Sequence, residues 1–344
     1  MYFRKHNYLI VTLLIFYVTV NLFAGGGKRN GTAGAQELLI PVGANGLSLH
    51  GSNVSSLTGI EALYYNPGGL GSSKNPTETF FSHMSYIADI GVSFAAVSAQ
   101  FEGFGVVAFS VKSLDFGNIP VTTVANPQGT GSTFSPSFVT LGVSYANSLT
   151  DRIHVGVTFN LITEKIVNTS ATGIGFNAGV QYNGIAEVEG LKFGIVFRNI
   201  GPQMKFDGPD LLRTASEDKG LRGLQNYKID AASFELPSQL ELGLSYEKEF
   251  SNNFKGLVSS SFEHNNFLDD QIKVGAEFGY QNMFFVRGGW ATSSGSSSTE
   301  NQIFGPTFGA GFVIDAGIQI TLNYAYRSVS YFSANNMLDI KFGF

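Results

Sequence analysis

The stretch QIKVGAEFGY, residues 271–280, decides the fold class because apolar residues alternate in it with polar or small ones. Successive side chains of a β-strand point to opposite faces, so the stretch predicts a strand with one apolar and one polar face. Residues 239–246 and 318–327 alternate in the same way. In the first stretch the apolar set is Ile272, Val274, Ala276, Phe278 and Tyr280, and the other set is Gln271, Lys273, Gly275, Glu277 and Gly279.

The length of these strands separates a membrane barrel from a soluble β-protein. Strands of soluble sheets average about 5 to 6 residues, whereas these run for about 9 to 11, the length of a tilted strand that crosses a bilayer. A lysine or arginine facing lipid near the midplane would cost about 2–4 kcal/mol. The polar face is therefore predicted to line the lumen, where the candidate polar residues are His154, Lys192, Arg198, Glu241, Lys273, Glu277, Arg287 and Arg327.

About fourteen such strands can be counted, an even number as in single-chain bacterial barrels. Most even-numbered connections are tight, whereas three odd-numbered ones, at 115–136, 201–237 and 291–306, are long. Short periplasmic turns and long extracellular loops predict this parity. We therefore expect an all-β protein, a transmembrane antiparallel barrel. Its strands are predicted to begin near Thr77, Gly91, Gly105, Phe138, Ile153, Gly173, Leu191, Gln239, Phe254, Gln271, Met283, Thr307, Gly317 and Met337.

Composition supports a membrane barrel and excludes a nucleic-acid partner. The 344 residues include 42 Gly, 31 Phe and 14 Tyr, and 14% are charged, against about 25% in soluble domains. The formal net charge is −5, and there is no basic patch that nucleic acid would require. The chain has no cysteine, which excludes disulfides and a lipid-anchored N-terminus.

The first 24 residues have the pattern of a cleaved signal peptide. Arg4 and Lys5 precede the apolar run 8–20, and small residues follow from Ala24. The run is shorter than the roughly 20 residues of a membrane-spanning helix, so export is favoured over the alternative of a retained anchor. We expect the mature protein, with a net charge of −7, in the outer membrane of a Gram-negative-type bacterium.

The C-terminal residues also alternate. Leu338, Ile340, Phe342 and Phe344 occupy one parity, and the chain ends on the aromatic Phe344. This ending resembles the signal by which bacterial outer-membrane proteins are recognised for insertion. The expected general partners are therefore the barrel-insertion machinery and outer-membrane lipid.

Residues 41–70, PVGANGLSLHGSNVSSLTGIEALYYNPGGL, contain no strand of useful length. Asn66, Pro67, Gly68 and Gly69 form a turn signal, because proline restricts φ and glycine permits a positive φ. Such a segment cannot bury itself, and the lumen of an outer-membrane barrel often holds a plug. We expect residues 25–75 to form a luminal hatch and residues 76–344 to form the barrel.

The hatch stretch resembles the N-terminal motif of the PorV/PorQ family, which is itself similar to the FadL-type transporters. The match lies in Pro41–Ala44, Gly46–Gly51 and Glu61–Leu70, which ends in an aromatic-Asn-Pro-Gly-Gly-Leu pattern. The departures are Asn45 where arginine is common, Leu49-His50 where Met-Gly is common, Thr58-Gly59 where an acidic pair is common, and Gly68 in place of alanine.

The resemblance implies one of two functions. PorV-like members belong to the type IX secretion system and bind secreted proteins by their C-terminal domains at the translocon, and this is the function expected first. FadL-like members take up hydrophobic small molecules, which is the alternative. Inward-facing glycines leave room for a hatch or a ligand, or else permit tight curvature. These glycines are Gly142, Gly156, Gly175, Gly179, Gly194, Gly243, Gly275, Gly279, Gly309 and Gly311.

The loop 201–237 is a candidate partner surface, and its residues 210–224 are predicted to form a short amphipathic helix. The alternative is a loop folded over the barrel mouth. Enzymatic function is disfavoured, because His83 and Ser85 have no carboxylate nearby and there is no Gly-x-Ser-x-Gly elbow, metal-ligand cluster or phosphate loop. No catalytic residue, metal or cofactor is expected.

Overall fold

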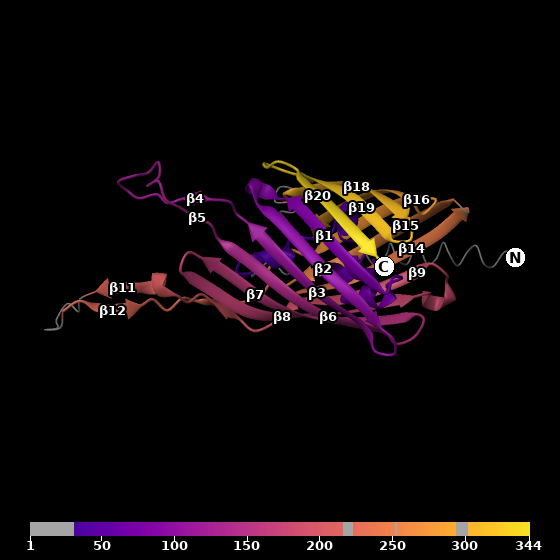
Figure 1. Ribbon diagram of the computed structural model, residues 1–344, viewed down its shortest axis with the longest axis horizontal. Coiled ribbons are helices and arrows are strands. Elements are labelled where there is room, and N and C mark those ends of the chain that lie inside the picture. Colours follow the sequence, from indigo (N-terminus) through magenta and orange to yellow (C-terminus); the bar gives the residue numbers. More distant parts are fainter. Residues whose placement is uncertain (1–30, 216–222, 252, 294–301) are drawn as a thin grey trace.

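The protein is a closed antiparallel barrel of fourteen strands (Figure 1). The structure is a computed structural model, which describes residues 31–215, 223–251, 253–293 and 302–344. The fold class and the number of strands expected from the sequence are confirmed. The predicted signal peptide, residues 1–24, lies outside the described residues. In the parts of the chain that are described, no helix combines the length and the apolar character needed to cross a membrane.

The barrel strands follow one another in chain order, and the first pairs with the last. They are β1 (Thr77–Ser85), β2 (Gly91–Phe101), β3 (Gly105–Asp115), β6 (Ser137–Ser148), β7 (Ile153–Ile166), β8 (Thr169–Asn183), β9 (Leu191–Ile200), β14 (Gln239–Ser251), β15 (Phe254–Asn265), β16 (Gln271–Tyr280), β17 (Phe284–Ser293), β18 (Phe304–Asp315), β19 (Gln319–Val329) and β20 (Asn335–Gly343).

Strand β16 shows the predicted orientation of the two faces. Val274, Phe278 and Tyr280 are 43%, 49% and 38% exposed on the outside of the barrel, whereas Lys273 is buried on the inside. The same parity extends into β14, where Glu241 is buried. The charged face therefore lines the lumen, and the outer wall presents apolar side chains as a lipid-facing surface does.

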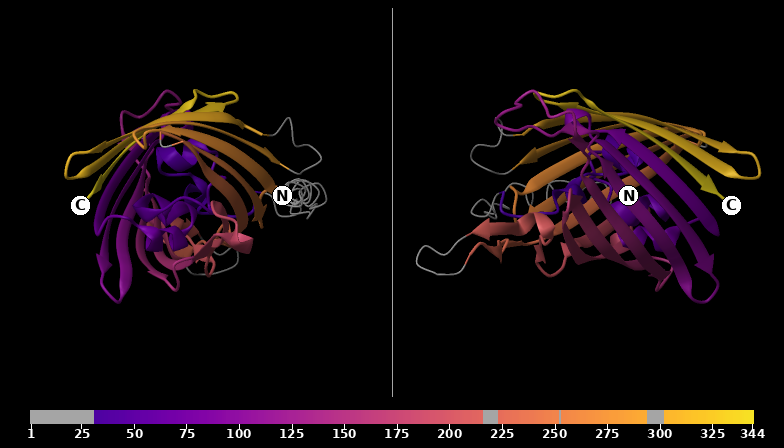
Figure 2. Two further views of the ribbon diagram at one scale, coloured as in Figure 1. Left: turned by 90° about the vertical axis from the view of Figure 1, so that its right-hand side faces the viewer. Right: turned by 60° about the vertical axis from the view of Figure 1, so that its left-hand side comes forward.

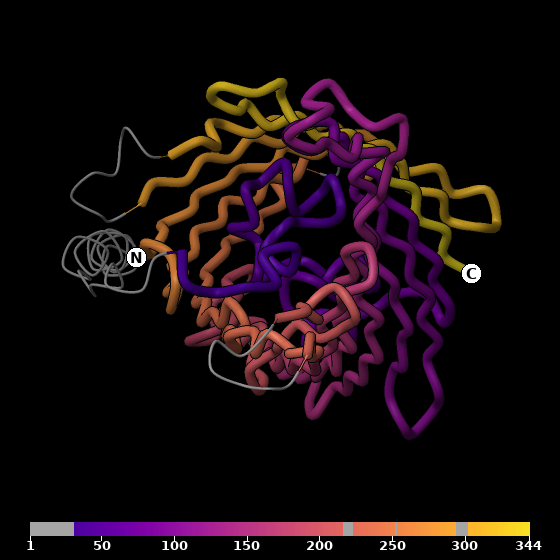
Figure 3. The backbone as a smooth tube through the Cα atoms, turned by 90° about the vertical axis from the view of Figure 1, so that its left-hand side faces the viewer, coloured from indigo at the N-terminus to yellow at the C-terminus, as the bar shows by residue number. Residues whose placement is uncertain are grey.

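Residues 31–76 precede the first strand and are called the N-terminal segment below. They lie inside the ring of strands, where Figures 2 and 3 show them in indigo. Val42, Ile60, Leu63 and Leu70 form one buried cluster with residues of β1, β2, β3 and β6. The helices of this segment are η2 (Gln36–Leu39), α2 (Ala44–Ser48), η3 (Gly59–Glu61), α3 (Ala62–Tyr65) and η4 (Pro67–Ser72).

Polar contacts also tie the N-terminal segment to the barrel wall. The Ile60 N–H donates to Glu78 Oε2 at 2.8 Å, and Lys341 Nζ pairs with Glu61 Oε2 at 2.8 Å. Helix α2 packs against β17, β18, β19 and β20, and η4 packs against β6, β7 and β8. The segment thus contacts opposite sides of the wall and fills much of the lumen.

Inward-facing glycines let the N-terminal segment approach the wall closely. A Cβ at Gly156 would overlap the Pro67 carbonyl group, and one at Gly194 would lie 2.7 Å from the Val54 carbonyl oxygen. Such distances leave no room for a methyl group. Of the ten glycines predicted to face inward, those that meet the segment in this way are Gly156, Gly179, Gly194, Gly243, Gly275 and Gly309.

Two hairpin arms extend beyond one end of the barrel (Figure 1). The third connection carries β4 (Ile119–Pro120) and β5 (Thr133–Phe134), and the seventh carries β10 (Met204–Lys205), β11 (Leu212–Ala215), β12 (Gln225–Lys228) and β13 (Ser233–Phe234). Three further 3₁₀ turns are η5 (Ile87–Asp89), η6 (Ile185–Glu187) and η7 (Pro209–Leu211).

The helix predicted for residues 210–224 is wrong where this region is described. Residues 212–215 pair antiparallel with residues 225–228, and residues 216–222 lie outside the described chain. The apolar spacing of Leu211, Leu212 and Leu224 fits one face of a helix equally well, so amphipathicity alone could not distinguish the two structures.

The C-terminal strand closes the barrel. It pairs with β1 on one side and β19 on the other, and the Phe344 N–H donates to the Thr77 carbonyl at 2.9 Å. Leu338 and Phe344 are exposed on the outer surface, whereas Asp339 is buried. The role of Leu338, Ile340, Phe342 and Phe344 as an insertion signal stays a prediction.

Candidate functional site

A cavity of about 880 Å³ lies between the N-terminal segment and the inner wall of the barrel, near one end of the strands. Its walls include residues at the ends of β3, β7 and β19 and at the starts of β6, β14 and β16. These strand ends carry the odd-numbered connections, so the cavity opens toward the end from which the hairpin arms extend. Its lining is mainly apolar, and its volume suits a small organic molecule.

One wall of the cavity is held by a buried network of four charged residues from four adjacent strands. Arg198 Nη2 donates to Glu241 Oε2 at 2.6 Å and to Glu263 Oε2 at 2.8 Å. Lys273 Nζ bonds to the same two carboxylates, at 3.1 Å and 2.5 Å. Ser261 donates to Glu241 Oε1 at 2.6 Å. The two cations and two carboxylates balance, so this wall carries no net charge.

Two ionisable residues of the N-terminal segment border the cavity in neutral form. Burial lowers the pKa of His50 to about 3, and the nearby cations Arg327 and Lys273 lower it further. Burial and the adjacent carboxyl of Glu164 raise the pKa of Glu37 to about 8. At neutral pH His50 is therefore uncharged and Glu37 is protonated.

The predicted turn at residues 66–69 anchors the base of the N-terminal segment. Asn66 is fully buried, its Nδ2 donates to the carbonyls of Val54 and Val180 at 2.9 and 3.1 Å, and its Oδ1 accepts from the Gly68 N–H at 3.0 Å. Pro67 begins η4 at a position where its missing N–H is tolerated. One side chain thus ties two parts of the segment to β8, and a Cβ at Gly69 would overlap the Leu57 carbonyl.

Comparison with known proteins identifies the fold. No protein-family profile matches the chain, and no curated protein matches its sequence. Among solved structures, the CymD monoaromatic hydrocarbon channel is similar with a TM-score of 0.56 and 13% identity, over 89% of this chain and 98% of that one. The barrel has the FadL-type fold.

Two further structures support the same fold. The toluene transporter TodX of Pseudomonas putida is similar with a TM-score of 0.50 and 12% identity, over 84% of this chain and 95% of that one. A Pseudomonas aeruginosa FadL homologue is similar with a TM-score of 0.51 and 10% identity, over 88% and 98% of the two chains. At these identities the likeness concerns the fold alone.

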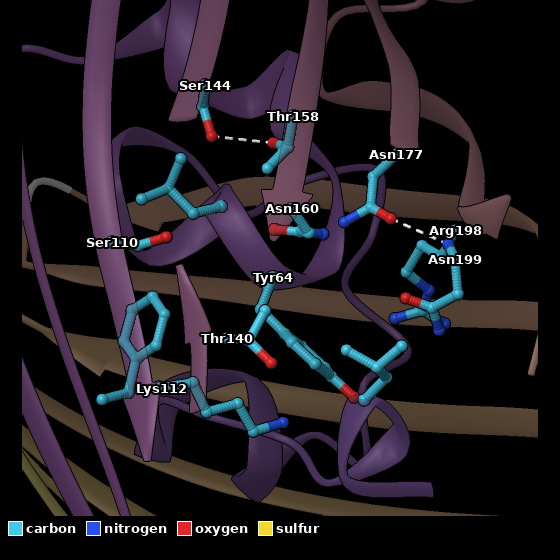
Figure 4. A pocket seen from close by; sticks show the side chains of 13 residues that line it. Tyr64, Ser110, Lys112, Thr140, Ser144, Thr158, Asn160, Asn177, Arg198 and Asn199 are labelled. Atoms are coloured by element: carbon cyan, nitrogen blue, oxygen red, sulfur yellow. Dashed lines mark hydrogen bonds between the residues drawn. The ribbon is translucent and has the colours of Figure 1, made fainter. Parts of the chain in front are cut away.

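Within this FadL-type barrel, a second and smaller chamber of about 50 Å³ lies beside the large cavity. Figure 4 shows the Tyr64 ring in this chamber, with Lys112 on one side and Arg198 on the other. The ring centroid lies 5.1 Å from Lys112 Nζ and 5.6 Å from Arg198 Cζ, distances typical of cation–π contacts. The polar residues that line this chamber are Ser110, Lys112, Thr140, Ser144, Thr158, Asn160, Asn177, Arg198 and Asn199.

Tyr64 and Arg198 border both the large cavity and the small chamber. Arg198 is fixed by two carboxylates, whereas Tyr64 is held by ring contacts, including an edge-to-face contact with Tyr65 at 5.0 Å. The aromatic ring of Tyr64 thus lies between the large cavity and the small chamber.

The other predicted luminal residues lie apart from the cavity. Lys192 pairs with Glu247 at 2.6 Å, where both side chains keep some exposure. Arg287 pairs with Glu277 at 2.5 Å and donates to Asn323 at 2.9 Å. His154 hydrogen-bonds to Ser148 at 2.7 Å. Of the eight residues predicted from the sequence, Arg198, Lys273 and Arg327 border the cavity directly, and Glu241 supports two of them.

Sequence reasoning missed three residues that shape the site: Glu263, Lys112 and Tyr64. Glu263 shares the inward parity of Ser259 and Ser261 on β15, so counting in steps of two along that strand would have found it. Lys112 could have been found in the same way on β3. No sequence signal distinguishes Tyr64 from Tyr65, since their directions depend on how α3 enters the lumen. In the described ranges no group of three or more His, Asp or Glu residues could hold a metal ion.

Proposed function

We propose that this protein is an outer-membrane channel for the uptake of hydrophobic small molecules, in which the N-terminal segment acts as the hatch. The observation that carries the proposal is the largely apolar cavity of about 880 Å³, which lies directly against this segment. A concave apolar site with a few polar groups is the usual form of a small-molecule site. A molecule bound there can move further only if the segment moves.

The comparisons favour uptake over secretion. The solved structures with this fold include proteins described as a monoaromatic hydrocarbon channel and a toluene transporter, and neither of these is described as an enzyme. The type IX secretion role, with a translocon and cargo C-terminal domains as partners, was the first expectation from the PorV/PorQ resemblance, and no comparison supports it.

The proposed location follows from the barrel and from the two chain ends. An apolar outer wall suits lipid, and a barrel leaves no strand edge unpaired in the membrane. We propose export through a signal peptide at residues 1–24, cleavage of that peptide, and insertion guided by the C-terminal residues 338–344.

A disulfide that locks the N-terminal segment to the wall should stop uptake. Ser55 Oγ lies 2.9 Å from Ser245 Oγ on β14, so the pair Ser55→Cys/Ser245→Cys is placed to form a bridge, and the native chain has no cysteine to compete. Whole cells that produce the oxidised variant should take up radiolabelled 2-naphthylmethanol and 2-naphthoate no faster than cells without the protein. Reduction should restore the native rate.

The matched control is a bridge that leaves the segment free. Ser144 on β6 and Thr158 on β7 are hydrogen-bonded at 2.8 Å, so Ser144→Cys/Thr158→Cys joins two strands of the wall. Its uptake should be the same when oxidised and when reduced. Equal uptake by the oxidised and reduced forms of the Ser55/Ser245 variant, with the bridge confirmed by mass spectrometry, would contradict a moving hatch.

A further inference from the structure

The guanidinium of Arg327 is a buried cation whose hydrogen-bonding capacity is not used. Its residue is 5% exposed and borders the large cavity. Its Nε and Nη2 donate no hydrogen bond, and within the described parts of the chain it has no carboxylate partner. By contrast, Arg198 and Arg287 each bond to a carboxylate. A buried charge without a partner is costly, so it points to a ligand that supplies one.

The free atoms of Arg327 define the geometry of that ligand. Nε–H and Nη2–H lie on one edge of the guanidinium, and such a pair can bind both oxygens of one carboxylate. The Phe304 ring lies 3.8 Å from Cζ and the Tyr86 ring 5.9 Å from it. These rings hold the guanidinium plane, and the Nε–Nη2 edge is buried without a hydrogen-bond partner, so a planar anion would reach it only after a small shift of the side chains that cover it.

The cavity wall suits a ligand that contains an aromatic ring. Rings pack well against rings in offset or edge-to-face contacts, and eight aromatic side chains border this cavity. They are Tyr64, Tyr65, Tyr86, Phe116, Phe138, Phe206, Phe234 and Phe304.

Few groups in the cavity compete with an anionic ligand. Glu263 is already bonded to Arg198 and Lys273, and Glu37 is protonated at neutral pH. Glu164 lies on β7, which is far from β19 in the strand order of the barrel. The neutral His50 has a buried Nδ1 without a hydrogen-bond partner. The charge of Arg327 is among the causes that lower the pKa of His50, so His50 lies near Arg327 and offers the ligand a second polar contact.

We propose that the cavity binds an aromatic carboxylate, whose two oxygens accept hydrogen bonds from Nε and Nη2 of Arg327 while its ring packs against the aromatic wall. This inference rests on the proposed uptake function and names its substrate class. It distinguishes an aromatic acid from a neutral hydrocarbon and from an aliphatic acid.

The test compares two probes that share one ring system. Binding of 2-naphthoate and of neutral 2-naphthylmethanol to the detergent-solubilised protein is followed by naphthalene fluorescence. Because hydrogen bonds to charged groups are the strong ones, Arg327→Gln should weaken naphthoate binding by about 10- to 150-fold and leave the alcohol unchanged. Arg327→Lys keeps the positive charge but lacks the paired N–H groups of the guanidinium, so its naphthoate affinity should fall less than that of Arg327→Gln. Lys192→Gln, a cation outside the cavity, should change neither affinity.

Each outcome bears on the proposal. An equal loss for acid and alcohol in Arg327→Gln would assign Arg327 a packing role and overturn the inference, as would unchanged binding of both. Tighter Arg327-dependent binding of decanoate than of naphthoate would overturn the aromatic part. If the native protein binds the alcohol and the acid with equal affinity, the result supports the uptake function and overturns the preference for an acid. If it binds neither probe, both proposals fail.

Discussion

Replacing Glu241 with glutamine is expected to lower the free energy of unfolding of the barrel by about 3–5 kcal/mol. Glu241 is fully buried and accepts bonds from Arg198, Lys273 and Ser261. Its neutralisation leaves two buried cations facing the single carboxylate of Glu263. The uncompensated charge, rather than the lost hydrogen bonds, is the main cost.

Urea titration of the folded protein in detergent micelles measures this change. Lys192→Gln is the control, because Lys192 and Glu247 form an ion pair whose side chains are 21% and 33% exposed, and such pairs contribute below about 1 kcal/mol. The double variant Glu241→Gln/Lys273→Gln restores the charge balance and should be more stable than Glu241→Gln alone. A double variant less stable than either single one would show that charge balance is not the reason.

Gly156→Ala is expected to displace the base of the N-terminal segment and increase ion leakage through the barrel. The new Cβ would overlap the Pro67 carbonyl, and a backbone group cannot move aside as easily as the end of a flexible side chain. Overpacking of this kind costs about 1–3 kcal/mol. Since 1.4 kcal/mol is tenfold in an equilibrium, the undocked fraction should rise by about 5- to 150-fold.

Single-channel conductance in planar bilayers and limited proteolysis of residues 31–76 report the displacement. Gly175→Ala is the matched control, because its Cβ would meet the nearest atoms of Ile162 and Leu236 at 3.4 Å, an ordinary contact. It should behave like the native protein in both assays. Native conductance and a native cleavage pattern in Gly156→Ala would mean that the segment adjusts without undocking.

Strand β16 shows how far local rules carried the prediction. Its alternation placed Lys273 and Glu277 inside and Phe278 outside, and the structure agrees. The wrong helix prediction at residues 212–215 shows the limit of these rules. These residues form a strand in an arm that extends beyond the barrel, where no membrane forces apolar side chains to one face, and their apolar spacing fits a helix as well as a strand. Prediction succeeded in the barrel strands, where alternate residues must be apolar to face lipid and polar or small to face the lumen.

Alternation and strand length in the amino-acid sequence predicted the fourteen-stranded barrel, the inward or outward direction of residues on strands such as β16, and a compact segment before the first strand. A bilayer penalises every misplaced charge, so parity and strand length are sufficient for these features. The amino-acid pattern does not show that Glu241 and Glu263 share Arg198 and Lys273, or that Arg327 has no carboxylate partner among the described residues; the folded barrel does. The reason is that pairing between side chains on the inner wall depends on the stagger of neighbouring strands and on the path of residues 31–76, and both arise from contacts between residues far apart in the chain.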